Sequence, residues 1–442
     1  MSRRETALKY FIEQEKEWKI RTESGIELYR KGNGVINIKH RDGSPVGEGV
    51  KVKLKQKNHE FRFGANIFML DEFETDEKNR IYREKFPEFL NLATLPFYWS
   101  DLEPEEGKPR FAADSPKIYR RPATDLCVDY CLEKGIEPKC HCLNYDNFVP
   151  DWLRHDTSDA YKKKLDRRMR EISERYADKI PSFEVTNETL QGFSPIHSKF
   201  YYDDDFLDWS YRTAAKYFPL NRLIINDYDI WSPGGYNDRC IYYMQIERLL
   251  SHGITHLDSI GLQFHSFFPQ ESEASIAKQR YNPESLYMMM DNYARLGKNL
   301  QITEMTIPAY SKNEEDEEIQ AELTCGVYRT FFSHPAMEAV IYWNLVDGYA
   351  YNAKPGDVTA GENVFFGGLL RFDMSEKPVY KALKKMINEE WNTETVIDAV
   401  NGKCDFRGFY GDYDVLIVKD GSEIPSELSL SKDKKNVFDI LI

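Results

Sequence analysis

Residues 182–187 read SFEVTN, residues 222–226 read RLIIN and residues 258–263 read DSIGLQ. Each run is short and mostly apolar, as the buried strands of a parallel sheet are. The segments between them, residues 204–217 and 238–252, space their apolar side chains as helices do. This alternation predicts parallel strands joined by crossover helices, the repeating unit of an α/β fold.

The same alternation extends in both directions along the chain. Eight such runs occur, near residues 61–64, 90–94, 138–143, 182–187, 222–226, 258–263, 299–303 and 339–343. Helix-like segments separate most of them, at residues 121–134, 159–177, 204–217, 238–252, 284–296, 315–333 and 376–391. Eight strands alternating with helices over about 330 residues predict a (β/α)8 TIM barrel at residues 61–392. An open parallel sheet is the alternative, but the sequence has no glycine-rich phosphate loop.

The two ends of the chain depart from this pattern. Residues 1–60 read as a charged helix or arm followed by a β-hairpin, whose strands at 35–40 and 50–56 alternate apolar and polar side chains. Residues 393–442 also return to strand-like patterns. Neither end is long enough for its own core, so we expect the C-terminal segment to pack with residues 35–60 as one small accessory β domain.

Composition and charge argue against nucleic acid and membranes as partners of this protein. The formal net charge of -14 argues against nucleic acid, whose phosphates such a chain repels. No apolar run approaches the ~20 residues of a membrane span. The first residues, MSRRET, precede no apolar stretch of the kind found in signal peptides. We therefore expect a cytoplasmic protein as the sequence stands, or a secreted or periplasmic one if a leader has been trimmed.

The cysteines raise the question of a metal. Cys127 and Cys131 are spaced four apart on an expected helix, and Cys140, His141 and Cys142 follow on the next strand. Structural zinc sites use short loop spacings instead, and His141 would face away from the two cysteines beside it. We expect buried free thiols, no metal and no cofactor.

Two carboxylates end predicted strands. Glu188 follows the fourth run and Glu304 ends the seventh. The other strand ends carry His141, Gln263, His265, and Trp343 with Asp347. Barrel active sites lie at these ends, and glycoside cleavage needs one carboxylic acid and one carboxylate there. Structural ion pairs are the alternative interpretation of such glutamates.

The chain resembles glycoside hydrolase family 10, the endo-β-1,4-xylanase family. The matching blocks, in order, are DLEPEEG at 101–107, FEVTNE at 183–188, NDY at 226–228, IGLQFH at 260–265, ITEM at 302–305, and Trp343 with Asp347. Together they fall within residues 61–391. The resemblance implies a retaining hydrolase of β-linked, xylose-containing oligo- or polysaccharides.

The resemblance also implies a role for each matching residue. Glu188 would be the general acid/base and Glu304 the nucleophile. Asn187 would bind the sugar 2-hydroxyl, and His265 would hold Glu304 ionised and oriented. The remaining implied substrate-binding residues are Gln263 beside both carboxylates, His141 and the apolar floor Trp343 in the −1 subsite, Tyr228, and Tyr351 in place of a second tryptophan. Tyr228 either stacks on the leaving sugar or is an ordinary rim tyrosine.

Departures from the family concern substrate binding. The second strand of the family carries Glu, Asn and Lys side chains that bind the glycone, whereas here Leu95, Pro96 and Phe97 occupy that stretch. Only the first histidine of the His-Thr-Leu-Val-Trp-His block remains, as His141. A blocked or apolar glycone subsite is therefore expected, with short or decorated substrates preferred over polymeric xylan, unless Tyr98, Asn144 or Asp146 rebuilds the subsite.

Three other functions stay open. The barrel could bind sugar without turnover, act as a β-glycosidase on substrates other than xylan, or use a metal held by His141, Asp146 and His265. The last lacks a close ligand spacing.

Overall fold

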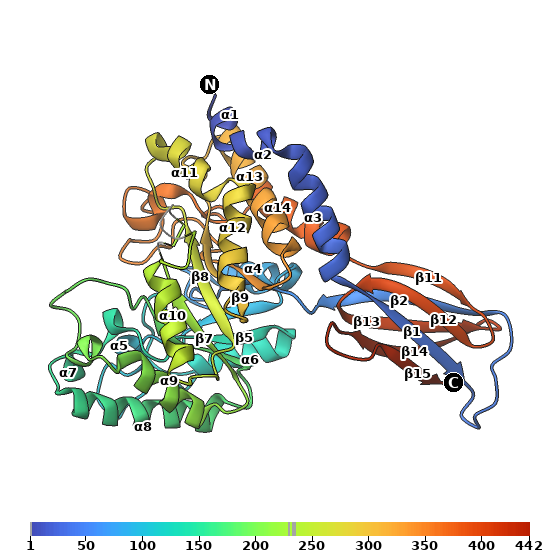
Figure 1. Cartoon of the computed structure of the whole chain (residues 1–442), viewed down its shortest axis with the longest axis horizontal. Coiled ribbons are helices and arrows are strands. Elements are labelled where there is room, and N and C mark those ends of the chain that lie inside the picture. Colours follow the sequence, from blue (N-terminus) through green and yellow to red (C-terminus); the bar gives the residue numbers. More distant parts are fainter. Residues whose placement is uncertain (1, 229, 232–235) are drawn as a thin grey trace.

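The computed structural model describes residues 2–228, 230–231 and 236–442. Eight parallel strands close into a barrel in the order β10-β3-β4-β5-β6-β7-β8-β9. Their bounds are β3 (Arg62–Asn66), β4 (Leu92–Pro96), β5 (Glu137–His141), β6 (Ser182–Asn187), β7 (Arg222–Asp227), β8 (Ser259–His265), β9 (Asn299–Thr306) and β10 (Met337–Tyr342). The predicted (β/α)8 fold is confirmed (Figure 1).

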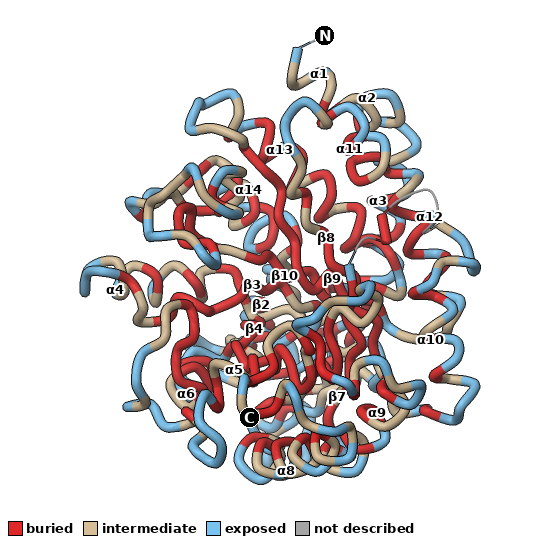
Figure 2. Tube along the Cα trace, turned by 90° about the vertical axis from the view of Figure 1, so that its left-hand side faces the viewer, coloured by how far each residue is buried: buried red, intermediate tan, exposed pale blue. Residues whose placement is uncertain are grey.

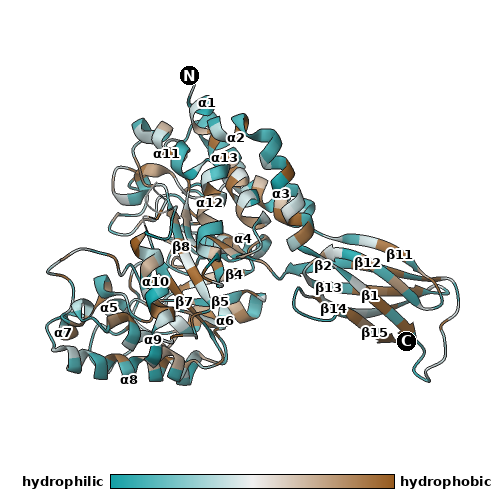
Figure 3. Ribbon diagram, in the orientation of Figure 1, coloured by the Kyte–Doolittle hydropathy of each residue, from teal (hydrophilic) through white to brown (hydrophobic). Residues whose placement is uncertain are grey.

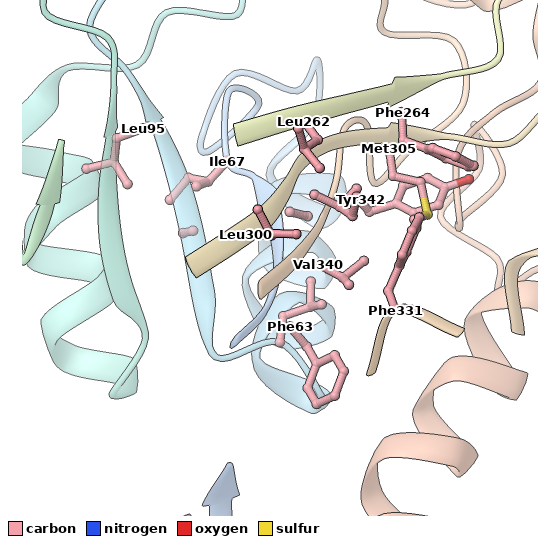
Figure 4. Packing of buried hydrophobic residues seen from close by; sticks show 14 of the residues in the cluster. Phe63, Ile67, Leu95, Leu262, Phe264, Leu300, Met305, Phe331, Val340 and Tyr342 are labelled. Carbon is pink, nitrogen blue, oxygen red and sulfur yellow. The ribbon is translucent and has the colours of Figure 1, made fainter. Parts of the chain in front are cut away.

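Helices surround the barrel and shield the outer face of its strands. Their bounds are α4 (Asp76–Lys85), α5 (Trp99–Leu102), α6 (Thr124–Lys134), α7 (Asp151–Arg154), α8 (Ser158–Tyr176), α9 (Phe206–Tyr217), α10 (Ile241–Ser251), α11 (Glu273–Arg280), α12 (Pro283–Ala294), α13 (Glu314–Ser333) and α14 (Pro378–Lys385). The strands are buried and apolar while the helices expose polar faces (Figures 2 and 3). Phe63, Leu300 and Val340 belong to the apolar cluster that joins the strands to this layer (Figure 4).

Three helices precede the barrel and pack on its outside: α1 (Arg3–Ala7), α2 (Lys9–Glu13) and α3 (Glu15–Tyr29). Trp18 on α3 donates its indole N–H to Thr330 Oγ1 on α13 at 2.9 Å. A Cβ at Gly25 would lie 2.4 Å from the carbonyl oxygen of Ser333, so only glycine permits this close approach of α3 to α13. The charged N-terminal arm is thus an additional helical layer on the barrel.

The accessory strands form two small sheets beside the barrel. Their bounds are β1 (Lys31–Lys39), β2 (Val50–His59), β11 (Glu394–Ala399), β12 (Lys403–Phe409), β13 (Gly411–Lys419), β14 (Ser422–Leu430) and β15 (Val437–Leu441). One sheet has the order β12-β1-β15 and the other β11-β2-β13-β14. Side chains of both sheets, including Ile36, Val52 and Ile417, share a separate hydrophobic core. The accessory β unit therefore draws strands from both ends of the chain (Figure 1).

The predicted hairpin between β1 and β2 is wrong. The two strands lie in different sheets, with C-terminal strands on both sides of each. Each strand has one apolar face, and those faces bury Ile36 and Ile38 of β1 with Val52 and Leu54 of β2 in the common core. Alternation identified the strands correctly, but it does not distinguish strands paired side by side from strands stacked face to face.

Truncation after Trp391 is expected to lower the melting temperature by about 5 °C or more, because 1 kcal/mol alone shifts it by about 2–4 °C in domains of about 200 residues. The truncation removes every strand that pairs with β1 and β2 and exposes their apolar faces. Differential scanning calorimetry would measure the shift, and kcat/KM ratios between substrates should stay within about 2-fold, since the cleft is built by the barrel. Loss of sugar binding by a barrel that remains folded would instead assign ligand binding to the accessory sheets.

Candidate active site

One cleft collects the polar side chains at the carboxyl ends of the barrel strands. It has a volume of about 660 Å³ and is lined by Glu188, Glu304, Asn187, Gln263 and His265, among others. Glu188 comes directly after β6, and Glu304 lies on β9. β7 and β8 lie between these two strands in the barrel, but the carboxyl ends of all its parallel strands meet at one face, which brings the two glutamates into the same cleft.

Glu188 is held by three hydrogen-bond donors. Its Oε2 accepts from the Tyr145 hydroxyl at 2.6 Å and from Gln191 Nε2 at 2.8 Å. Its Oε1 accepts from Gln263 Nε2 at 3.2 Å. The backbone at Glu188 is left-handed, with φ of 51°, a strained conformation for a residue other than glycine. The carboxyl group is therefore fixed in the cleft by both its backbone and its contacts.

Tyr145 and Gln191 were not predicted as site residues. Tyr145 occupies the tryptophan position of the His-Thr-Leu-Val-Trp-His block, so its place in that motif was the available signal. Gln191 follows Glu188 by three residues in an irregular segment, where spacing carries no information about side-chain direction.

Glu304 is almost completely buried, although it lies near the end of its strand. It is 4% exposed, and this burial raises its pKa to about 8. Its Oε1 accepts from Asn226 Nδ2 at 2.8 Å, a hydrogen bond that favours the ionised form. His265 Nε2 lies 3.0 Å from Oε2. Asn226 was part of a matched block but had no predicted role.

The His265 ring bridges Glu304 and Thr306. Its Nδ1 lies 3.0 Å from Thr306 Oγ1. Burial lowers the pKa of His265 to about 4, so the ring is neutral at neutral pH. With Nδ1 accepting from the threonine hydroxyl, Nε2 carries the proton and donates it to Glu304.

A buried ionic chain lies next to Glu304. Glu184 contacts both the Lys139 ammonium and His141 Nδ1, and the three side chains are inaccessible to solvent. Burial opposes ionisation of Glu184, but Lys139 and His141 outweigh it and lower its pKa to about 2. His141 Nε2 lies 3.0 Å from the Tyr98 hydroxyl. Both ring nitrogens of His141 therefore have partners within the protein. The group at this position that can form a polar contact with a ligand is the Tyr98 hydroxyl.

The same chain contains the possible metal ligands. In the described part of the protein, the one group of three closely spaced ligand atoms comes from His141, Glu184 and Glu304, all within 4.8 Å of one another. The Lys139 ammonium already neutralises Glu184, so an ion-pair network accounts for the group.

Other strand-end candidates are structural. The Asp347 carboxylate pairs with the buried Lys377 ammonium at 3.2 Å. Asp146 accepts two hydrogen bonds from Ser198, from the backbone N–H and the hydroxyl, both at 2.6 Å. Asp146 therefore does not join His141 and His265, and the hypothetical metal trio is not assembled. The cysteines at 127, 131, 140 and 142 are buried free thiols.

Aromatic rings form the wall beside the carboxylates. Trp343 packs edge-on against Phe68, with ring centroids 5.3 Å apart, and against His265 at 5.6 Å. Tyr98 stacks on Phe148 at 4.3 Å. Tyr228 and Tyr351 also line the cleft and are 41% and 44% exposed. These rings offer apolar faces to a sugar.

The sequence predicted an apolar glycone subsite made by Leu95, Pro96 and Phe97, but none of the three lines the cleft. Leu95 is buried in the main hydrophobic core (Figure 4). Phe97 lies in the same core and packs against Tyr176 of α8, with ring centroids 5.7 Å apart. The cleft wall at this strand is made by Tyr98 together with Phe68 and Arg121. Because side chains alternate along a strand, Leu95 and Phe97 share one side, and both pack in the core rather than at the cleft surface.

A closed parallel barrel with paired glutamates at its strand ends defines the class of (β/α)8 glycoside hydrolases. The chain belongs to glycosyl hydrolase family 10, whose sequence model matches residues 75–386.

Two relatives match most of the chain. The chain is 23% identical to endo-1,4-beta-xylanase 2 of Arabidopsis thaliana over 94% of its own length and 35% of that protein. It is 21% identical to anti-sigma-I factor RsgI6 of Acetivibrio thermocellus, over 92% of its length and 47% of the relative. The chain thus spans between a third and a half of these relatives.

Solved structures show the same fold. Native xylanase 10B of Thermotoga maritima superposes with a TM-score of 0.59 at 20% identity, covering 75% of this chain and 96% of that one. Xylanase 10B of Thermotoga petrophila in complex with xylobiose gives 0.59 at 20% identity, covering 75% and 95%. Each helix in the described part of the chain is too short or too polar to span a membrane.

Proposed function

We propose that this chain hydrolyses β-linked, xylose-containing oligo- or polysaccharides with retention of anomeric configuration, using Glu188 as acid/base and Glu304 as nucleophile. The observation that carries the proposal is the amide bridge between them. Asn187 Oδ1 accepts from Asn226 Nδ2 at 2.8 Å and from Gln263 Nε2 at 3.3 Å. The same two nitrogens contact Glu304 and Glu188. One amide oxygen thus links the two carboxylates through two shared N–H donors, which places both at one site, as double displacement requires.

The proposed mechanism assigns a step to each group. A Glu304 oxygen attacks the anomeric carbon while Glu188 gives its proton to the departing glycosidic oxygen, leaving a covalent glycosyl ester. Glu188 then takes a proton from water, whose oxygen attacks the anomeric carbon from the face that the leaving group vacated, opposite Glu304, and breaks the ester bond. Asn187 binds the sugar 2-hydroxyl, Trp343 supports the apolar face of the ring, and His265 holds Glu304 in orientation.

The anomer formed first tests this mechanism. Proton NMR during hydrolysis of an aryl β-glycoside should show the β-anomer before mutarotation. Initial appearance of the α-anomer would establish inversion. Binding of the sugar without any turnover would favour the alternative of a non-catalytic sugar-binding barrel.

As the pH is lowered, the kcat/KM of this enzyme is expected to start falling well above pH 4.5, the ordinary pKa of a glutamate. Glu304 must be ionised to attack, and burial raises its pKa to about 8 in the free protein. The rate therefore rises with pH as Glu304 loses its proton. Asn226→Ala removes a hydrogen bond that favours the carboxylate, so the acid limb should move up by about one pH unit or more.

Asn221→Ala is the matched control for this pH profile. Asn221 precedes the same strand, and its amide caps the carbonyls of Ala177 and Ile180 at 2.7 and 2.8 Å. Loss of the Asn221 amide should lower the stability of the protein and leave the acid limb of the kcat/KM profile at the same pH. An unchanged limb in Asn226→Ala would remove Asn226 from the control of Glu304 ionisation.

Short substrates are expected to be turned over better than polymeric xylan, although the reason differs from the one drawn from sequence. The wall by β4 presents the rings of Phe68 and Tyr98 and the Arg121 side chain, which fill space beside the −1 position. Comparison of kcat/KM on xylobiose, xylotetraose and xylan measures the preference. Random internal cleavage of long unsubstituted xylan at the highest kcat/KM would establish an open groove instead.

A further inference from the structure

Two consecutive arginines line the cleft on the side of β3, β4 and β10. Arg120 and Arg121 lie in the segment between α5 and α6 and are 2% and 4% exposed. This side is opposite β7 and β8 in the barrel order. The protein as a whole carries a net charge of -14, so two guanidinium groups at one end of its cleft oppose the general charge balance.

Arg120 is a buried cation without an ion pair. Its guanidinium donates to the carbonyl oxygen of Tyr349 and to Asn344 Oδ1, the latter at 3.0 Å. In the described part of the chain, no salt bridge reaches it, and its Nε has no hydrogen-bond partner. Glu362 is connected to it only through Asn344, whose Nδ2 donates to Glu362 Oε2 at 2.9 Å. A buried charge without a direct counter-ion is unfavourable, and an anion entering the cleft would relieve that cost.

The position of Arg120 is fixed by its backbone. Its φ is 61°, a left-handed conformation that costs free energy for a side chain of this size. Such conformations persist where the surrounding structure over-determines them, and they cluster at ligand sites. The hydrogen bonds to Tyr349 and Asn344 hold the side chain in the lining of the cleft.

Arg121 presents a second guanidinium edge. Its Nε donates to Asp101 Oδ2 at 2.8 Å and its Nη1 to the carbonyl oxygen of Arg120 at 2.9 Å. Its Cζ lies 4.3 Å from the Tyr98 ring centroid. Within the described residues Nη2 makes no hydrogen bond, which leaves its two N–H groups for a ligand.

We propose that this pair of arginines binds a carboxylate carried by the sugar on the glycone side, so that the preferred substrate is an acidic, uronic-acid-bearing β-linked oligosaccharide. The orientation rests on the proposed function: Glu188 protonates the leaving oxygen, so the leaving sugar lies towards β6 and β7 and the glycone towards β3, β4 and β10. Planar guanidinium groups match a carboxylate through parallel N–H donors, and burial excludes the water that would weaken the pair.

The test uses the unmodified protein and one substrate in two charge states. Xylotetraose bearing a glucuronic acid branch on its glycone half is compared with the methyl ester of the same compound, which has nearly the same shape and no charge. We expect kcat/KM to be about 10-fold or more higher for the acid, as expected for a charged hydrogen bond. Moderate salt should reduce this ratio while unbranched xylotetraose is affected less.

Variants distinguish binding of the substrate carboxylate by Arg120 from a purely structural role of its side chain. Arg120→Gln should reduce the acid-to-ester ratio about 10-fold or more, and Glu362→Gln should raise it by removing a nearby anion. Arg80→Gln, on the exposed face of α4, is the matched control. Circular dichroism and melting temperature establish that each variant is folded. If Arg120→Gln does not fold, the inference is still tested by the acid-to-ester ratio of kcat/KM, measured in the unmodified protein and in Glu362→Gln.

Two outcomes would overturn the inference. Equal kcat/KM for acid and ester in the unmodified protein is one, and an Arg120→Gln ratio unchanged in a folded protein is the other. Both leave the hydrolase assignment intact if unbranched xylotetraose is cleaved. If nothing is cleaved, the proposed function fails separately, and calorimetric titration of the acid and its ester into Glu304→Ala still measures whether the carboxylate is bound.

Discussion

Glu304→Ala is expected to abolish turnover of every substrate, with kcat lowered by about 10⁴-fold or more, as happens when a nucleophile is removed from a cooperating set. Among the described residues that line the cleft, the other carboxylates have partners of their own, and Glu362 accepts from Asn344 Nδ2 at 2.9 Å. The Glu188 carboxyl is held by Tyr145, Gln191 and Gln263, and Glu184 is occupied by Lys139 and His141. The loss should therefore be the same for good and poor leaving groups.

The measurement is steady-state hydrolysis of a dinitrophenyl β-glycoside and of xylotetraose by the same preparation. Glu133→Ala, an exposed glutamate on α6, is the control and should retain full activity. The Glu304→Ala protein should still bind sugar, since Asn187, Trp343 and Tyr98 remain. Residual turnover of the activated glycoside within about 10-fold of the unmodified protein would show that Glu304 is not the nucleophile.

Glu188→Ala is expected to fail in a way that depends on the leaving group. Hydrolysis of xylotetraose, whose leaving oxygen needs a proton, should fall by about 10²–10⁴-fold. A dinitrophenolate leaves without protonation, so the glycosyl ester should still form on Glu304 and accumulate, because no base remains to activate water. A burst of dinitrophenol followed by slow turnover is the expected progress curve.

Azide distinguishes this assignment from general damage to the site. A small anion needs no base, so added azide should restore turnover in Glu188→Ala and give the β-glycosyl azide. The same addition should do nothing for Glu304→Ala, which forms no ester. Equal loss of activity in both variants, without rescue on the activated substrate, would contradict the assignment of the two roles.

The fold was predictable because its signals are local. Each barrel strand is a short apolar run bounded by a helix-like segment, as in RLIIN at residues 222–226, and such a run can be recognised without knowing its neighbours. The placement of Glu188 and Glu304 followed from the same signals, since the carboxyl ends of all strands in a parallel barrel meet at one face.

The surroundings of these glutamates were less predictable. Tyr145 and Glu188 are 43 residues apart, and Asn226 and Glu304 are 78 apart, yet each pair shares a hydrogen bond. Such contacts depend on the register of the closed barrel and on side-chain direction. The same is true of Phe97, whose sequence position indicated the cleft while its side chain packs against Tyr176.

The sequence by itself determined the order of strands and helices, the two strand-end glutamates and the presence of β strands at both ends, because periodicity of 2 or 3.6 residues is a property of each segment alone. Only the tertiary structure decided that β1 and β2 lie in different sheets and that His141 is enclosed between Glu184 and Tyr98. It alone also decided that Arg120 lines the cleft with no ion pair to any described residue. These features arise from packing and charge balance between distant segments, which have no periodic signature along the chain.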